Sequence, residues 1–222
     1  MQTIRQIYDE YKIMPSLQLH QLRVAAVAKM ICANLQKPID ADAAVLACLF
    51  HDMGNILKFN LAYFPEFLEP KRLEYWKSVK EEFAKKYGTN QHEASEKIAK
   101  EIGLPETVIN CISAVGFSKA SEILAGDSWE KKICEYSDMR VGPFGVLTLS
   151  DRIMDGRKRY ITRGETNPTS IAKTDGKFDE LFRLLLELEK QIFASAKIKP
   201  EDITDGAIQT TVEELKDFRI VY

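Results

Sequence analysis

Two adjacent side chains, His51 and Asp52, stand at the end of an apolar stretch and directly before Met53 and Gly54. Imidazole and carboxylate groups both bind divalent metal ions, and both are costly to bury without a partner. The pair therefore indicates either a satisfied core histidine or one part of a metal site. Further ligands elsewhere in the chain must decide between these two interpretations.

The other two histidines of the chain also fall at informative positions. His20 comes three residues after Leu17 and four before Val24, so it shares the apolar face of a predicted helix and points inward. His92 follows Asn90, a residue type that is favoured as a helix N-cap, so it belongs to the first turn of the next helix. All three histidines thus lie on an inner face or at a helix end.

A carboxylate far along the chain completes a candidate ligand set. Asp138 shares a helix face with Cys134, near the end of an amphipathic segment. The polar residues that point inward or stand at helix ends are then His20, His51, Asp52, His92 and Asp138. Nitrogen and oxygen donors of this kind suit an octahedral divalent ion with open water positions, and Mn²⁺, Fe²⁺, Co²⁺, Ni²⁺, Mg²⁺ and Zn²⁺ are all compatible. Because no cysteine belongs to the set, a closed structural zinc site is disfavoured.

Helical periodicity dominates the segments that must position these groups, and no strand alternates clearly over six or more residues. We expect N-caps at Ser16, Asp40, Asn90 and Asp127, and a turn-rich stretch over 162–177. The expected helices cover residues 2–12, 16–35, 40–52, 71–87, 90–103, a segment after 105, 127–140, a segment from 148, 178–196 and 204–218. The sequence therefore predicts an all-α fold.

Length, composition and charge limit the classes of protein to which the chain can belong. A chain of 222 residues, 45% hydrophobic, can bury a substantial core without a structural metal. A net charge of −2 lacks the basic character of most nucleic-acid-binding proteins. Four widely spaced cysteines without a CxxC pair are typical of a reducing compartment. No basic-apolar leader and no run of about 18 apolar residues is present, so we expect a cytoplasmic protein with no membrane segment.

The order of His20, His51-Asp52 and Asp138 resembles the metal signature of the HD-domain phosphohydrolase superfamily. The surroundings are similar as well, in residues 19–28, in the alanine-rich approach to His51, and in residues 136–141. The resemblance spans residues 16–160 and implies an HD-domain-like helical bundle. On this basis residues 1–222 form a single all-α domain, with an HD core over 16–160 and C-terminal helices over 176–222 that pack on the core or extend it.

The resemblance also implies a chemistry. Most characterised members hydrolyse phosphate esters, so it implies a metal-dependent phosphohydrolase that acts on a nucleotide or a similar small phosphate ester, as a phosphomonoesterase, nucleotidase or phosphodiesterase. His20, His51, Asp52 and Asp138 would hold one divalent ion, which would lower the pKa of a bound water that serves as the nucleophile. Asp52 would accept a proton from this water. His92 would protonate the leaving oxygen or contribute to a second ion.

Departures from the family pattern keep other functions open. Asn55 stands where a lysine is common, so Lys58 is the candidate substitute for a phosphate contact and Arg140 is a further candidate. A catalytically weak regulatory HD domain that binds a metal and a nucleotide is therefore an alternative. Oxidative cleavage at a di-iron site needs more ligands than the chain offers, and an HD-GYP phosphodiesterase needs a Gly-Tyr-Pro motif that is absent. The apolar stripe over 178–192 fits either the core or a homodimer face.

Overall fold

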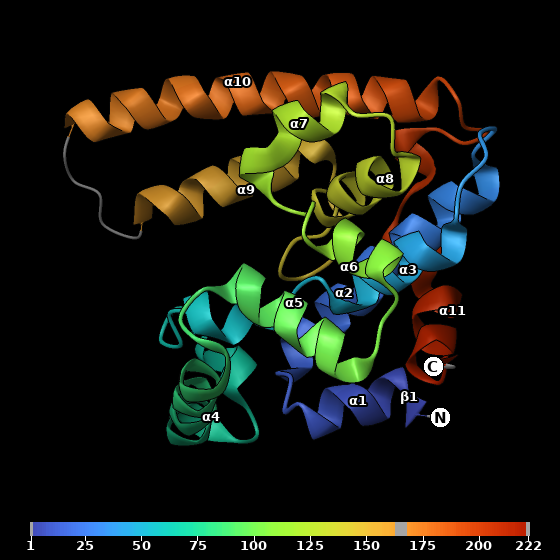
Figure 1. Ribbon diagram of the computed structural model, residues 1–222. Helices are drawn as coiled ribbons and strands as arrows, with labels where there is room; N and C mark the ends of the chain where they lie inside the picture. The colour runs from blue at the N-terminus through green and yellow to red at the C-terminus, as the bar shows by residue number, and fades with distance from the viewer. Residues whose placement is uncertain (1, 163–167, 221–222) are drawn as a thin grey trace.

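The computed structural model describes residues 2–162 and 168–220, and these residues are almost entirely helical (Figure 1). Two helices, α2 (Pro15–Asn34) and α3 (Ala41–Phe50), lie at the centre and pack closely against each other. Their contact faces carry small buried residues such as Ala25, Ala28 and Ala44, which let the two backbones approach. The prediction of an all-α fold is confirmed.

The remaining elements surround this central pair. The first residues, in β1 (Gln2–Thr3), pair antiparallel with the last described ones, in β2 (Arg219–Ile220), so the two ends of the chain lie together (Figure 1). The other elements are α1 (Ile4–Glu10), the 3₁₀ turns η1 (Asn55–Lys58) and η2 (Pro65–Leu68), α4 (Arg72–Tyr87), α5 (Gln91–Ile102), α6 (Glu106–Ile112), η3 (Phe117–Lys119), α7 (Ala120–Ala125), α8 (Trp129–Asp138), α9 (Leu149–Thr162), α10 (Pro168–Phe193), η4 (Pro200–Asp202) and α11 (Asp205–Lys216).

Two of the predicted caps are confirmed, and they fix the helices that approach the site. The Asp40 carboxylate accepts a hydrogen bond from the Ala43 main-chain N–H at 2.9 Å and begins α3. The Asn90 side chain accepts from the main-chain N–H of His92 at 2.9 Å and begins α5. Each bond satisfies a donor that a helix N-terminus otherwise leaves unpaired.

Two other predicted caps are wrong by one or two residues. Helix α2 begins at Pro15 rather than after Ser16, because proline needs no N–H partner and its fixed φ suits the first helical position. Helix α8 is capped by Ser128 rather than Asp127, and the Ser128 hydroxyl accepts from the Lys131 N–H at 3.3 Å. Neither shift moves the candidate ligands off their predicted faces.

The C-terminal helices pack on the core. Helix α10 begins at Pro168, earlier than the predicted start at 178, while residues 163–167 of the expected turn-rich stretch lie outside the described residues. Its stripe is core: Leu185, Leu188 and Ile192 are fully buried, and α10 contacts α7, α8 and α9. Helix α11 packs against α2. The apolar stripe is thereby accounted for within the chain itself.

No single helix among the described residues is both long and apolar enough to cross a bilayer. The bent pair formed by Glu106–Ile112 and Phe117–Ala125 reaches that length and composition only when its two parts are combined. Apolar side chains of this pair, including Val108, Ile112 and Ile123, are buried in the core.

Candidate metal centre

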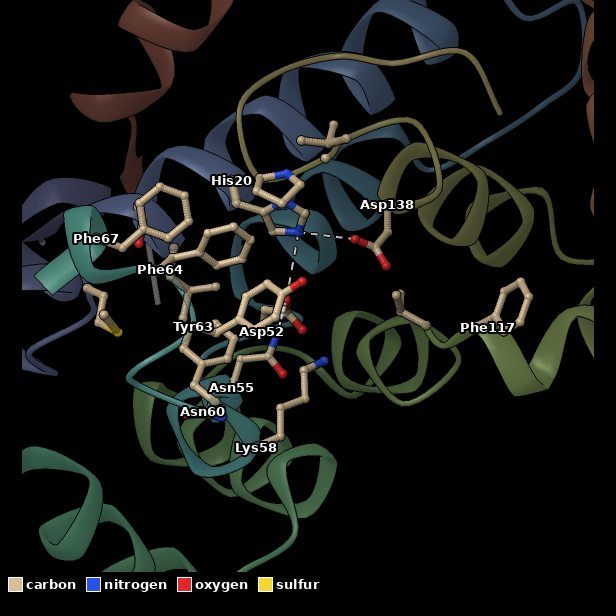
Figure 2. A pocket seen from close by; sticks show the side chains of 18 of the residues that line it. His20, Asp52, Asn55, Lys58, Asn60, Tyr63, Phe64, Phe67, Phe117 and Asp138 are labelled. Atoms are coloured by element: carbon tan, nitrogen blue, oxygen red, sulfur yellow. Dashed lines mark hydrogen bonds and ion pairs between the residues drawn. The ribbon is translucent and has the colours of Figure 1, made fainter. Parts of the chain in front are cut away.

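Three mutually packed helices bring four candidate ligands to one point. His20 lies in α2, His51 caps the C-terminus of α3 with Asp52 directly after it, and Asp138 is the last residue of α8. Helices α2, α3 and α8 all contact one another, so side chains separated by more than a hundred residues meet there. Figure 2 shows His20 turned toward Asp138 and Asp52, with a dashed line to each carboxylate.

The distances between the donor atoms fit a single ion. His20 Nε2 lies 3.1 Å from Asp138 Oδ1 and 3.7 Å from Asp52 Oδ2. His51 Nε2 lies 3.5 Å from Asp138 Oδ1 and 3.6 Å from Asp52 Oδ2. Ligand atoms that each sit about 2.0–2.2 Å from one ion are themselves about 3–3.5 Å apart in octahedral or tetrahedral arrangements. Each histidine therefore stands close to coordination spacing from both carboxylates, and the ligand atoms of His20, His51 and Asp52 all lie within 4.8 Å of one another.

The orientation of His51 provides an independent test of this fit. Its Nδ1–H donates to the Cys48 carbonyl at 2.9 Å, which directs Nε2 toward the two carboxylates. The Nε2 atom is buried and has no hydrogen-bond partner. Buried polar atoms are rarely left unpaired, and a ligating histidine characteristically donates its other ring N–H to a carbonyl or carboxylate. The residues present thus fit a divalent ion.

Electrostatics support the same conclusion. Burial lowers the pKa of His51, but the adjacent Asp52 and Asp138 carboxylates outweigh it and raise the pKa to about 9. Burial raises the pKa of Asp138, but the hydrogen bond with His20 and the nearby His51 imidazole hold this pKa well below its usual range. An ionised Asp138 at a buried point needs a positive charge, which either an imidazolium proton or a divalent cation can supply.

A family model described as the HD domain matches residues 18–138, which is more than half of the chain. The chain belongs to the HD-domain family. No curated protein and no solved structure matches it significantly. HD domains bind divalent metals and are generally hydrolases, and the cluster of His20, His51 and Asp52 in this HD domain is a candidate metal site.

A cavity of about 490 Å³ opens over the candidate ligands of the HD domain. His20, Asp52 and Asp138 line its floor, and Lys58, His92 and Arg152 also face it. Aromatic residues form much of the remaining wall, namely Phe59, Tyr63, Phe64, Phe67 and Phe117. The volume falls within the range of about 300–1,000 Å³ that is usual for small-molecule sites.

His92 lies in the first turn of α5, as the sequence predicted, and its side chain lines the cavity. It does not belong to the candidate ligand cluster found among the described residues. Partial burial and the nearby Lys58 and Lys119 lower its pKa, although Asp52 partly opposes them. The free imidazole is therefore mainly neutral near pH 7. A phosphate dianion beside it would raise its pKa again and make it a better proton donor.

Asn55 contributes to the site differently from the lysine that it replaces. Its side chain is buried, and its amide Nδ2 donates a hydrogen bond to Asp52 Oδ2. Its main-chain N–H also donates to the Asp52 carbonyl at 2.9 Å. Asn55 therefore fixes the orientation of the Asp52 carboxylate and places no charge in the cavity.

Arg140 does not occupy the position expected of a phosphate contact. The side chain is 2% exposed, and all of its N–H groups have acceptors within the protein. These acceptors are the Tyr136 hydroxyl and the carbonyls of Leu147, Pro200 and Ile203. Because no N–H is left for a ligand, the structure corrects this prediction: Arg140 ties the C-terminal helices to the end of α8.

Sequence reasoning missed a second cation at the cavity. Arg152, in α9, lines the cavity and donates from Nε to the Val141 carbonyl at 2.8 Å. In the sequence it looked like an ordinary surface arginine on an amphipathic helix. Its position depends on the turn between α8 and α9, which folds α9 back toward the site, and no local spacing predicts that turn.

Proposed function

We propose that this HD domain is a divalent-metal-dependent phosphohydrolase that acts on a nucleotide or a similar small phosphate ester. The observation that carries the proposal is the unpartnered, buried Nε2 of His51, which faces two carboxylates and a second histidine. A bound ion would polarise the phosphoryl group and supply a nucleophile near neutral pH. Family membership supports the hydrolase class.

The residues around the candidate ligands have complementary roles in this proposal. Lys58 and Arg152 line the cavity beside Asp52 and attract the anionic phosphate. Asp52 Oδ1 is the candidate proton acceptor, because Oδ2 faces both histidines and accepts from Asn55. His92, which also lines the cavity near Lys58, holds a proton for the leaving oxygen once the phosphate raises its pKa.

One observation favours a second candidate function, a catalytically weak regulatory domain that binds a metal and a nucleotide. The Asn55 amide donates to Asp52, the residue best placed to accept a proton, and so occupies one acceptor position of its carboxylate. Such a domain would keep the metal and the ligand but hydrolyse the ligand slowly. The two functions share a site and differ in turnover.

The test compares the wild type with Asp52→Ala, and with Asp127→Ala as a matched control at an exposed carboxylate outside the cavity. Metal content is measured by plasma mass spectrometry. Hydrolysis is followed on nucleoside mono-, di- and triphosphates, phosphomonoesters and phosphodiesters with Mn²⁺, Co²⁺, Ni²⁺, Mg²⁺ or EDTA.

We expect Asp52→Ala to lose both metal and hydrolysis while it keeps its helical circular dichroism, because the core of the fold does not depend on an ion. Asp127→Ala should behave as the wild type. Normal metal content in Asp52→Ala would refute the ligand assignment. Tight nucleotide binding by the wild type with no turnover under any metal would favour the regulatory function.

A further inference from the structure

Four aromatic rings form a continuous group at one side of the cavity, and they come from two distant parts of the chain. Tyr63, Phe64 and Phe67 belong to the segment around η2, while Phe144 lies in the turn between α8 and α9. The ring centroids of Phe64 and Phe67 are 4.9 Å apart, and Phe144 lies 5.8 Å from Phe64 and 5.4 Å from Phe67. We call Phe64, Phe67 and Phe144 the aromatic wall.

Phe144 is 66% exposed, the largest exposed fraction among the large apolar side chains that the structure records as exposed. Burial of the ring therefore does not set its position. Main-chain contacts set it instead: the Gly142 N–H donates to the Gly145 carbonyl at 2.8 Å, and the Val146 N–H donates to the Asp205 carboxylate at 3.1 Å. A turn held this firmly presents its phenylalanine to the ring edges of Phe64 and Phe67.

The turn is also closely packed beneath the ring. A Cβ atom at Gly145 would lie 2.5 Å from Asp205 Oδ2, so a larger residue there would displace that carboxylate. Asp205 in turn lies 3.5 Å from Arg23 Nε of α2. The base of the turn is thus fixed to the helical core, while Phe144 at its tip stays open to solvent.

Two rings of the aromatic wall line the cavity of the candidate metal ligands, and Phe144 contacts these two rings from outside the cavity lining. Phe64 and Phe67 line the same 490 Å³ space as His20 and Asp52. Figure 2 shows the two phenylalanines on one side of His20, while Lys58 lies beyond Asp52. One end of the cavity is therefore suited to an anion and the other to an apolar ring, and the space is far larger than a phosphate group needs.

We propose that the aromatic wall binds a planar aromatic group of the substrate, and that Phe64, which lines the cavity and contacts the other two rings, is a specificity-determining residue for phosphate esters that carry such a group. This inference rests on the proposed function and narrows it to aryl or heteroaromatic phosphate esters over polyol phosphates. Partly exposed rings held at a cavity mouth bind planar rings by offset or edge-to-face contacts, at little conformational cost.

The experiment uses two ligand pairs that differ mainly in the aromatic group. Phenyl phosphate and glycerol phosphate serve for hydrolysis, and benzylphosphonate and methylphosphonate, which lack a hydrolysable ester, serve for calorimetric binding to the metal-loaded protein. The variants are Phe64→Ala and Phe64→Leu, with Phe218→Ala as a control at a phenylalanine that does not line the cavity.

We expect Phe64→Ala to weaken benzylphosphonate binding and to lower kcat/KM for phenyl phosphate about 3- to 10-fold, as the loss of one aromatic contact predicts. The methylphosphonate and glycerol phosphate values should change less than about twofold. Phe64→Leu, which keeps apolar volume but not a planar face, should fall between Phe64→Ala and the wild type. Phe218→Ala should match the wild type.

Equal losses for both members of a pair, or no loss for either, would overturn the inference even when the esters are hydrolysed. If no ester is hydrolysed but benzylphosphonate binding keeps the expected dependence on Phe64, the aromatic wall is supported and the proposed hydrolase function fails. The calorimetric arm thus separates the two failures.

Discussion

Gly54, the residue two positions after Asp52, offers the most direct test of how the site is held together. Its main chain packs against α5, and its N–H donates to the Ser95 hydroxyl at 2.9 Å. A Cβ atom at this position would lie 2.4 Å from the Gln91 carbonyl oxygen and 2.7 Å from Ala94 Cβ. Backbone atoms of a helix cannot turn away as a flexible side chain can, so Gly54→Ala must displace α5.

The size of this effect follows from the contact distances. Relief of the clash requires a movement of about 1 Å, and overpacking of this kind costs about 1–3 kcal/mol of unfolding free energy. His92 lies one residue after Gln91 in the same first turn, so it moves with α5. A displacement of about 1 Å at a group that acts on the substrate lowers the rate up to about 100-fold. The ligands on α2, α3 and α8 should keep their metal.

Urea unfolding followed by circular dichroism, metal analysis and hydrolysis assays would measure these three quantities on one preparation. The matched control is Gly176→Ala in α10, where an added Cβ meets nothing within 4 Å. Replacement of a helical glycine by alanine there should stabilise the protein by about 0.5–1 kcal/mol. A Gly54→Ala protein as stable and as active as the wild type would refute the close packing between η1 and α5.

Three further outcomes can be tested on the same protein. His92→Ala should lower the hydrolysis rate while metal content stays near normal, and loss of the metal would instead identify His92 as a ligand. Arg140→Ala should lower the unfolding free energy by about 2–4 kcal/mol with little change in KM, because its hydrogen bonds hold the fold; a selective rise in KM would contradict this role. Burial raises the pKa of Glu135 from 4.5 to about 7, although a hydrogen bond from the Gly116 N–H opposes the shift. A carboxyl whose pKa is higher in the folded state stabilises the protein fully below its unfolded value and loses this contribution as pH rises through about 7. Urea unfolding between pH 5 and 8 should show this loss, up to about 3 kcal/mol, and a Glu135→Gln protein with the same pH profile would disprove the assignment.

Local patterns in the sequence predicted the elements and the faces of the candidate ligands. The apolar spacing around His20 placed it inward, and the caps at Asp40 and Asn90 fixed where α3 and α5 begin. Such features depend on residues three or four positions apart, so they can be recognised without the fold. The predicted ligand roles themselves still await the metal measurements.

Contacts between distant segments account for what the sequence did not reveal. The acceptors of Arg140 include carbonyls about sixty residues further on, and Phe144 meets Phe64 and Phe67. No spacing rule relates these pairs, because turns and the packing of α9 and α10 decide which residues meet. The sequence therefore suggested that Arg140 could bind a phosphate and that Arg152 was an ordinary exposed side chain.

The replacement of the usual lysine by Asn55 separates two tasks that one residue could otherwise combine. Asn55 opens η1; its side-chain amide donates to the Asp52 carboxylate, and its main-chain N–H donates to the Asp52 main-chain carbonyl. A 3₁₀ helix has three residues per turn, so the side chains at positions 55 and 58 fall on the same face of η1. Lys58, one turn further on, is exposed and lines the cavity. The positive charge of Lys58 thus lies on the same face as Asn55 but one turn further from Asp52, where the proposed function assigns it to an incoming anion.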